Sequence, residues 1–259
     1  MIKKQPRLRI FAGPNGSGKS TIIQAVKNHR VKDIPVDFGI YINADDIAKS
    51  LRTNGFSFYK ISPRATQKEF VSIALDSGLI NKGFTKNQFI RCFQWNKNVI
   101  TLINKDTSEI LAQIIADFLR KKLLAEHKKF SFETVFSHKG KLDIMKEASE
   151  KGYKVYLYFV CTESPEINKF RVKEVRVKEG GHDVPEEKII SRYYRSLDLL
   201  FDAAQWAYQV YFFDNSGDEF SLFAHFKKVK DKKVWVIPDP SKVPQWFLNY
   251  YSTKVAATK

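Results

Sequence analysis

Hydrophobic positions occur in two patterns along the chain, as short continuous apolar runs and as longer segments with a helical period. The short runs predict strands at residues 8–12, 39–42, 130–136, 153–161 and 208–213. The periodic segments predict helices at residues 21–29, 106–122 and 141–151. Strands that alternate with helices indicate a parallel sheet covered on both faces, so we predict a three-layer α/β fold.

Two regions do not fit this alternation. Residues 53–105 contain Gly, Ser and Asn breaks and many aromatic residues without a steady period, which predicts an inserted, mostly helical cap. Residues 234–259 contain Trp and Pro but no period, and we expect an extended tail over the core. We therefore predict a main domain at residues 1–215 and a C-terminal extension, packed on the core, at residues 216–259.

Charge narrows the class of partner. The chain has 259 residues, with 44 Lys plus Arg against 28 Asp plus Glu, a formal net charge of +16, and 43% of the residues are hydrophobic. This hydrophobic content excludes a disordered chain, and the surplus of positive charge favours anionic partners. Nucleic acid, membrane headgroups and phosphorylated small molecules all satisfy that condition.

Cysteine content and hydropathy indicate the compartment. Cys92 and Cys161 are too few for a disulfide framework, and Cys161 closes an apolar run typical of a buried strand. Residues 1–9 are basic without an apolar core, and no stretch approaches the roughly 18 apolar residues of a membrane span. We expect a cytoplasmic protein without a membrane segment.

One motif specifies chemistry. Residues 13–20 fit the pattern G-x-x-x-x-G-K-[ST] at every fixed position, between a predicted strand and a predicted helix. Such a loop turns backbone N–H groups toward phosphate, its lysine reaches the β- and γ-phosphates, and its hydroxyl binds Mg²⁺. The motif predicts ATP and Mg²⁺ as cofactors, with Ser20 on the metal. The predicted nucleotide-binding residues are Gly13, Pro14, Asn15, Gly16, Ser17, Gly18, Lys19, Ser20 and Thr21.

Carboxylates follow or interrupt two of the predicted strands. Asp45 and Asp46 come directly after the second strand, at the edge where open α/β sheets bind ligands. We assign Asp45 as the general base and Asp46 as the helix cap, although either carboxylate could serve in either role. Glu133 interrupts the apolar third strand, so it should face a polar site or an ion pair. Thr134 beside it offers a hydroxyl for orientation or metal contact.

A third cluster contains arginines and a Gly-Gly pair. It comprises Arg171, Arg176, Gly180, Gly181, His182, Arg192 and Arg195. A mobile segment that brings an arginine to the γ-phosphate can supply much of the transition-state stabilisation in phosphoryl transfer. His182 could contact substrate. A solvated amphipathic helix is the alternative interpretation for any single arginine of the cluster.

In order and spacing, these residues resemble the zeta toxin family of P-loop kinases, especially its chromosomal zeta-like branch. Five blocks carry the resemblance: FAGPNGSGKST at 11–21, NADDI at 43–47, FET at 132–134, GGHDVP at 180–185 and RYYRS at 192–196. It implies a P-loop kinase-like domain that uses ATP and Mg²⁺ to phosphorylate a hydroxyl of a nucleotide sugar. In characterised members that acceptor is UDP-N-acetylglucosamine. The resemblance also allows for an antitoxin protein as a partner.

The resemblance also implies individual roles. The family's base falls on Asp45, its substrate-contacting glutamate on Glu133, and its phosphate-contacting arginines on Arg171 and Arg176. Two departures affect this transfer. Arg171 and Arg176 are one residue further apart than in the family pattern, which rotates one of them by about 100° on a helix. The insertion at 53–105 lies where an acceptor would enter.

Two other functions remain as alternatives. Lysine clusters near both ends of the chain and at residues 121–129 suit a nucleotide-gated nucleic-acid-binding ATPase, although the sequence has no zinc-finger, RNP or helix-turn-helix pattern. The strongly positive net charge also suits a polynucleotide 5′-hydroxyl kinase. We favour a nucleotide sugar or another phosphorylated small molecule as acceptor, and nucleic acid stays a secondary option.

Overall fold

The computed structural model describes residues 5–176 and 184–258, without the side chains of Val175 and Arg176. The chain divides into two compact units. Unit 1 comprises residues 1–38 and 131–259, and unit 2 comprises residues 39–130. Across the described residues, no helix combines the length and apolar character needed to cross a membrane.

Unit 1 is built on a twisted sheet with the strand order β12-β11-β10-β9-β1-β8. β1, β9 and β10 run parallel, whereas β11 and β12 run antiparallel to their neighbours. The strands are β1 (Arg7–Ala12), β8 (Phe130–Thr134), β9 (Lys154–Cys161), β10 (Gln209–Asp214), β11 (Ser221–Val229) and β12 (Lys232–Val236). The parallel strands match the predicted runs within two residues at each end.

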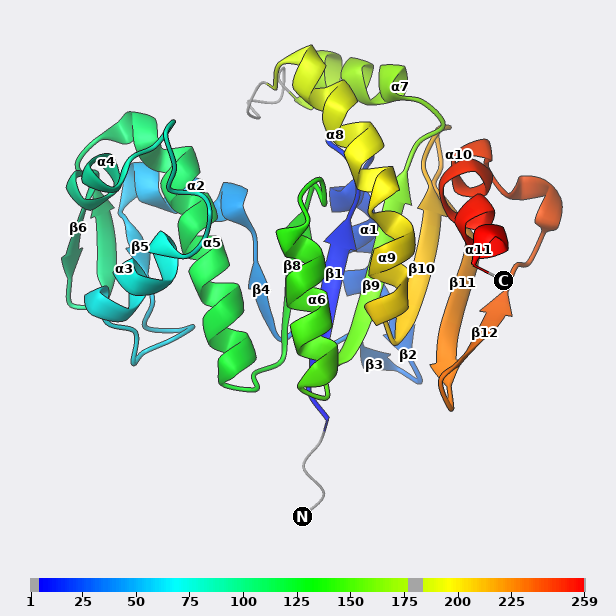
Figure 1. Ribbon diagram of the computed structural model, residues 1–259, viewed down its shortest axis with the longest axis horizontal. Helices are drawn as coiled ribbons and strands as arrows, with labels where there is room; N and C mark the ends of the chain where they lie inside the picture. Colours follow the sequence, from blue (N-terminus) through cyan, green and yellow to red (C-terminus); the bar gives the residue numbers. More distant parts are fainter. Residues whose placement is uncertain (1–4, 177–183, 259) are drawn as a thin grey trace. The chain divides into compact units, whose positions relative to one another are not determined.

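Helices cover both faces of this sheet, which confirms the predicted three-layer α/β fold. Figure 1 shows α6, α8 and α9 on one face and α1 on the other. The helices are α1 (Lys19–Asn28), α6 (Gly140–Glu150), α7 (Pro165–Phe170), α8 (Glu186–Asp198) and α9 (Leu200–Trp206). A π-helix, η2 (Arg171–Arg176), continues α7, and a small hairpin of β2 (Arg30–Val31) and β3 (Ile34–Pro35) follows α1.

The C-terminal segment is helical where we expected an extended tail. It forms η3 (Pro240–Lys242), α10 (Gln245–Phe247), η4 (Leu248–Ser252) and α11 (Thr253–Ala257). Trp246, Phe247 and Tyr251 are buried, and the last two pack against Phe212 of β10 at ring-centroid distances of 4.9 and 5.3 Å. These contacts with the sheet, rather than local periodicity, stabilise the short helices. In the predicted extension, β11 and β12 continue the sheet of unit 1. The domain boundary at residue 215 stays a prediction.

Unit 2 contains a strand, four α-helices, a short 3-10 helix and a small sheet among its described residues. Its antiparallel sheet has the order β5-β7-β6, and buried aromatic rings such as Phe58, Phe70 and Phe118 form its core. The elements are β4 (Ile40–Ile42), α2 (Ala44–Thr53), β5 (Phe56–Ser57), α3 (Gln67–Leu75), α4 (Lys86–Arg91), β6 (Phe93–Asn96), β7 (Val99–Leu102), η1 (Lys105–Thr107) and α5 (Ser108–Ala125). The aromatic-rich insertion thus combines helices with a sheet that its irregular pattern did not reveal.

Candidate nucleotide site

The loop between β1 and α1 contains three glycines whose conformation or packing excludes a side chain. Gly16 and Gly18 adopt φ values of 76° and 87°, in the left-handed region that other residues rarely occupy. A side chain at Gly13 would also collide with β9, because a Cβ there would lie 2.0 Å from the Val160 carbonyl oxygen. The glycines of the motif are therefore required by backbone conformation and by close packing.

The N-terminus of α1 is open to an anion. Its N-cap is Gly18, no side chain caps it, and its first turn contains no acidic residue. The N–H groups and the positive end of the helix dipole favour a phosphate at such a terminus. Ser20 is exposed in this first turn, and its contact with Mg²⁺ stays a prediction. Within the described ranges, no group of three or more His, Cys, Asp and Glu residues is arranged to hold a metal ion.

Lys19 lies over the loop rather than in solvent. Its side chain is 7% exposed, and its Nζ donates hydrogen bonds to the carbonyl oxygens of Gly13 at 3.0 Å and Pro14 at 2.9 Å. Glu133 Oε1 lies 3.9 Å from Lys19 Nζ, so the carboxylate predicted to face a polar site lies beside the lysine of the loop. At that distance the pair is loose, and an incoming phosphate can compete for the ammonium group.

Two asparagines, which the sequence analysis missed, hold the outer side of the loop. Asn168 of α7 donates its side-chain amide to the Asn15 carbonyl oxygen at 2.6 Å. Asn215, directly after β10, donates to the Ser17 carbonyl oxygen at 2.9 Å. Both side chains are buried. Their sequence separations of 153 and 198 residues from the loop explain why no local pattern pointed to them.

Arg171 contacts the loop after β10. Its guanidinium donates to the carbonyl oxygens of Asn215 at 2.6 Å and Gly217 at 3.0 Å. A contact between Arg171 and phosphate stays a prediction. The side chain of Arg176 and the residues Gly180, Gly181 and His182 lie outside the described part of the chain, so their predicted roles stay predictions as well.

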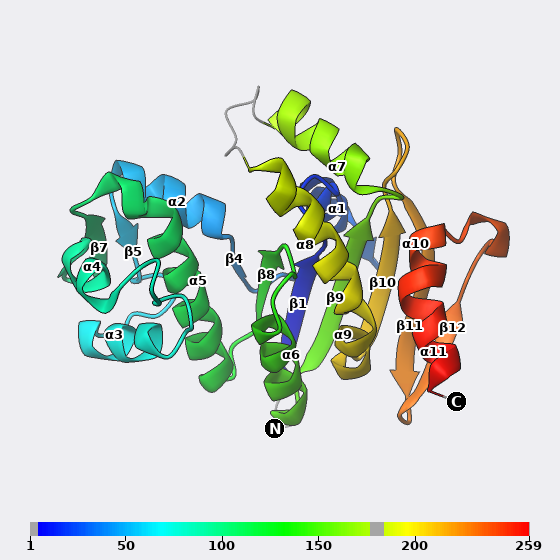
Figure 2. The ribbon, with the colours of Figure 1, turned by 45° about the horizontal axis from the view of Figure 1, so that its top comes forward.

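Arg192 of α8 lies next to the phosphate loop. Its Nη1 donates to Asn15 Oδ1 at 3.3 Å. Burial, and then the neighbouring Arg195 charge, lower the pKa of the Arg192 guanidinium. Arg195 is exposed and its Nε donates to the Ser191 carbonyl oxygen in its own helix. Figure 2 shows α7 and α8 at the carboxyl end of β1 and β9, where the loop also lies. Of the predicted arginines with described side chains, Arg192 therefore contacts the loop directly.

Thr134 has a local structural contact. Its Oγ1 accepts a hydrogen bond at 3.2 Å from the N–H of Phe136, a non-glycine residue with a φ of 59°. This bond shapes the turn that follows β8 and Glu133. A direct contact between Thr134 and substrate stays a prediction.

In unit 2, the carboxylates after β4 lie in the first turn of α2. The N-cap of this helix is Asn43, whose Oδ1 accepts a hydrogen bond from the Asp45 N–H at 2.8 Å. The assignment of Asp46 as the cap is therefore wrong, because the preceding asparagine already caps the helix. Both aspartates are exposed in the first turn, which the helix dipole favours for carboxylates.

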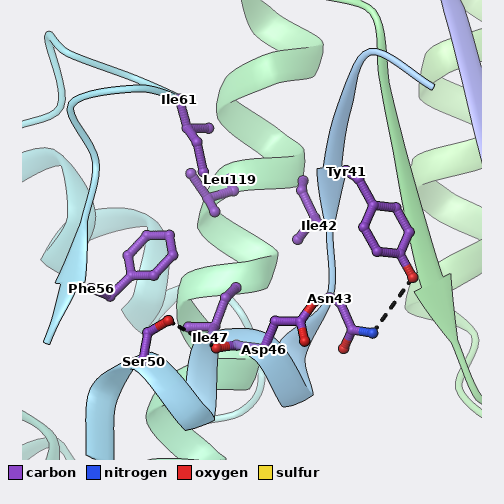
Figure 3. A pocket seen from close by; sticks show the side chains of 9 residues that line it. All are labelled: Tyr41, Ile42, Asn43, Asp46, Ile47, Ser50, Phe56, Ile61 and Leu119. Carbon is purple, nitrogen blue, oxygen red and sulfur yellow. Dashed lines mark hydrogen bonds between the residues drawn. The ribbon is translucent and has the colours of Figure 1, made fainter. Parts of the chain in front are cut away.

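Asp46 instead lines a small pocket of about 110 Å³ in unit 2. Figure 3 shows its carboxylate beside Asn43, with the Phe56 ring on the far side of the pocket. The remaining walls are mostly apolar, with Tyr41, Ile42, Ile47, Ser50, Ile61 and Leu119. The pocket combines a carboxylate, an amide and an aromatic ring. Its volume is below the roughly 300–1,000 Å³ typical of ligand pockets, so it could enclose only part of a ligand.

Solved structures share this fold. The AvrRxo1-ORF1:AvrRxo1-ORF2 complex with sulphate ions matches 92% of this chain and 62% of that chain, with a TM-score of 0.53 and 14% identity. The same complex with ATP matches with a TM-score of 0.52 and 13% identity. The PezAT chromosomal toxin–antitoxin system of Streptococcus pneumoniae has a TM-score of 0.46 and 13% identity, covering 97% of this chain and 80% of that chain. Identities this low show a shared fold with AvrRxo1-ORF1 and no more.

At the sequence level, an uncharacterized protein of Haemophilus influenzae is 36% identical over 70 residues, 27% of this chain and 49% of that protein. The chain thus spans about half of that relative and less than two thirds of the AvrRxo1 chain. No family model matches the chain.

Proposed function

We propose that the chain is an ATP-dependent phosphotransferase, similar to the zeta toxin kinases, that phosphorylates a hydroxyl of a nucleotide sugar such as UDP-N-acetylglucosamine. One observation carries the proposal. An uncapped helix N-terminus, two left-handed glycines and a buried lysine meet at one loop, and together they suit the phosphates of ATP. Bound Mg²⁺, held by Ser20 and the phosphates, would neutralise charge on the β- and γ-oxygens.

Transfer joins the acceptor oxygen to the γ-phosphorus and breaks the bond from that phosphorus to the β,γ-bridging oxygen. The acceptor proton moves to Asp45, the proposed general base. Lys19 and Arg192 stabilise the charge that develops on the phosphoryl oxygens, and Arg171 and Arg176 stay as further candidates for that role. Glu133, Thr134 and His182 are the proposed acceptor contacts.

The choice of acceptor rests on the chemistry near Asp45. The Asp46 carboxylate lines a small pocket with an aromatic ring on its far side, and it can accept a hydrogen bond from one hydroxyl group of an acceptor. The sequence resemblance to zeta toxins favours a nucleotide sugar, and the AvrRxo1 complex with ATP supports ATP as the donor. The proposal includes a cytoplasmic location and an antitoxin as partner, since AvrRxo1-ORF1 was solved with ORF2.

Purified full-length protein, ATP and Mg²⁺ incubated with a panel of nucleotide sugars and dinucleotides tests the proposal. We expect one class of acceptor to gain a single phosphoryl group by mass spectrometry, with stoichiometric formation of ADP. Unchanged acceptors together with intact ATP would contradict it. An oligonucleotide with a free 5′-hydroxyl belongs in the panel, and its selective phosphorylation would favour the polynucleotide kinase alternative.

Two matched substitutions separate the aspartates. Asp45→Asn should lower kcat at least a hundredfold, because it removes the proton acceptor, with little change in ATP affinity. Asp46→Asn removes the same charge one residue later, and we expect it to raise KM for the acceptor while kcat changes little. Equal turnover of Asp45→Asn and the unaltered protein would exclude Asp45 as the base.

A further inference from the structure

We infer that Asn168 and Asn215 are positioning residues that aim two backbone N–H groups of the phosphate loop, those of Gly16 and Gly18, at the phosphates. The inference rests on the proposed nucleotide binding and adds the residues that keep the loop ready for it. The geometry of two peptide bonds in the loop supports the inference. Neither asparagine belongs to the sequence motif at residues 13–20.

A trans peptide unit holds its C=O and the following N–H on opposite sides. Asn168 fixes the Asn15 carbonyl, and the next N–H belongs to Gly16. Asn215 fixes the Ser17 carbonyl, and the next N–H belongs to Gly18. Each asparagine therefore turns one glycine N–H away from itself, toward the inner side of the loop.

The two N–H groups are available for a ligand. Among the described residues, the N–H groups of Gly16 and Gly18 have no hydrogen-bond partner in the protein, whereas the Ser17 N–H bonds to the Pro14 carbonyl oxygen at 3.3 Å. Backbone donors without partners are rare in folded proteins unless they face water or a ligand. The loop thus presents two oriented donors, on the side opposite the asparagines.

Packing allows only glycine at the two contact points. A Cβ at Gly16 would lie 2.5 Å from the Asn168 carbonyl oxygen, and a Cβ at Gly18 would lie 2.0 Å from Asn215 Nδ2. A side chain at either position would displace the asparagine. The glycines of the motif thus serve the asparagine contacts in addition to their left-handed conformation.

Both asparagines are themselves held from the side away from the loop. Asn168 is fully buried, and its Oδ1 contacts the Thr162 hydroxyl, while the Thr162 carbonyl accepts a hydrogen bond from Tyr193 of α8 at 2.6 Å. Asn215 is 8% exposed, and Arg171 binds its carbonyl oxygen. Arg171 is thereby a support of Asn215 in this arrangement. Residues of α7, α8 and the segment after β10 therefore fix the orientation of the loop.

Substitution by leucine tests the inference, because leucine has nearly the shape of asparagine, lacks the donor and leaves the charge unchanged. We expect Asn168→Leu and Asn215→Leu each to weaken ADP binding about tenfold or more by calorimetry. In the transfer assay KM for ATP should rise more than kcat falls, because the asparagines touch the loop and no reacting atom. Asn98→Gly is the control: Asn98 also donates to a backbone carbonyl, that of Pro63 at 2.7 Å, in unit 2, and glycine removes the donor while fitting the left-handed φ of 65° there.

The outcomes are distinguishable. A wild-type protein that does not bind ADP would overturn the proposed function, whereas wild-type binding with unchanged affinity in both variants would overturn the positioning role alone. If the variants do not fold, ¹H–¹⁵N spectra of the wild-type protein decide the question. We expect saturating ADP to shift the Gly16 and Gly18 amide signals downfield and to leave the Asn98 side-chain amide unmoved. Unmoved glycine amides would overturn the inference.

Discussion

At the scale of single residues, Lys19 shows how one charge serves both the resting loop and the proposed reaction. Its ammonium group donates to two loop carbonyls and lies 3.9 Å from Glu133 Oε1. These contacts keep a mostly buried cation beside the position that the helix terminus favours for phosphate. We expect phosphate oxygens to replace these contacts when nucleotide binds.

Replacement of this ammonium group gives the first prediction. We expect Lys19→Met to lower kcat/KM at least a hundredfold, about 2.7 kcal/mol of transition-state stabilisation, while far-ultraviolet circular dichroism stays unchanged. Methionine keeps the apolar stem of the side chain and removes its charge. Lys27→Met, on the exposed end of the same helix, is the control and should retain activity. Comparable activity of the two variants would show that the loop lysine is dispensable.

Arg192 gives a second prediction at this scale. Its guanidinium reaches the Asn15 side chain, and lysine cannot reproduce the planar fork of donors that phosphate oxygens accept. We expect Arg192→Lys to reduce kcat/KM for ATP by at least tenfold, about 1.4 kcal/mol, in steady-state kinetics. Arg195→Lys, three residues along α8 and exposed, should stay within about twofold of the unaltered protein. The reverse order of the two effects would assign the phosphate contact to Arg195.

At the scale of elements, Lys233 of β12 contacts α9 and the neighbouring strand β11. Its Nζ donates to Gln205 Oε1 at 2.8 Å and lies 5.0 Å from the centroid of the Phe226 ring. Burial, and then the Lys228 charge, lower the pKa of Lys233 to about 8. Two of the five lysines between residues 227 and 233 therefore contact α9, since the Lys228 ammonium also donates a hydrogen bond to the Gln205 carbonyl oxygen.

This lowered pKa predicts a pH-dependent contribution to stability. In the unfolded chain the lysine stays protonated to about pH 10, whereas in the folded chain Lys233 loses its proton above about pH 8. Between these values the unfolded chain binds more protons at this site than the folded chain. The contribution of Lys233 to the free energy of unfolding therefore rises with pH. Burial raises the pKa of the Cys92 and Cys161 thiols, which oppose this trend in the same window. A comparison with Lys233→Met isolates the lysine. From pH 8 to 9.5 we expect the stability of the wild-type protein relative to this variant to increase by about 1 kcal/mol after solvent screening.

Urea unfolding at several pH values measures this difference. The variant and the unaltered protein share every other titrating group, so their thiol contributions cancel. A constant difference between pH 8 and 9.5 would mean that Lys233 titrates near its ordinary value. The measurement also reports whether the C-terminal elements unfold together with the sheet. A single cooperative transition indicates that they do, and two separate transitions indicate that they do not.

The elements also show which parts of the fold the sequence could predict. Continuous apolar runs such as residues 154–161 and the local glycine motif at 13–20 predict β9 and the phosphate loop without long-range information. β11 and β12 were missed because lysines interrupt their apolar pattern, as at Lys227 and Lys228. The short C-terminal helices depend on buried aromatic contacts that have no periodic signature. Elements marked by a local pattern of residues can thus be predicted, whereas elements that depend on contacts between distant residues cannot.

The same distinction applies to the candidate site. The loop residues and the arginine cluster that includes Arg192 were predicted because a motif or a charged cluster marks them in the sequence, and their contact with phosphate stays a prediction. Asn168 and Asn215 carry no such mark, and only the folded chain brings them to the loop. Positioning residues of this kind contact backbone atoms, so their side-chain type reveals nothing about a ligand.

At the scale of the whole molecule, the candidate chemistry is divided between the two units. The phosphate loop, α7 and α8 belong to unit 1, whereas Asp45, Asp46 and the pocket beside Asp46 belong to unit 2. The net charge of +16 is distributed over both and provides a field favourable to anionic ligands in general. A two-substrate reaction on such a molecule should leave a separate footprint for each substrate.

Hydrogen–deuterium exchange measured by mass spectrometry tests that division. We expect ADP with Mg²⁺ to slow exchange in peptides that cover residues 13–28 and 186–198 of unit 1. Nucleotide at a hundredfold excess over Kd stabilises the bound state by about 2.7 kcal/mol, and exchange through opening of the site should slow by about a hundredfold. The acceptor alone should protect residues 40–56 of unit 2 and leave the phosphate loop unchanged. Protection of residues 40–56 by ADP alone, with no effect of the acceptor there, would place the acceptor site elsewhere in the molecule.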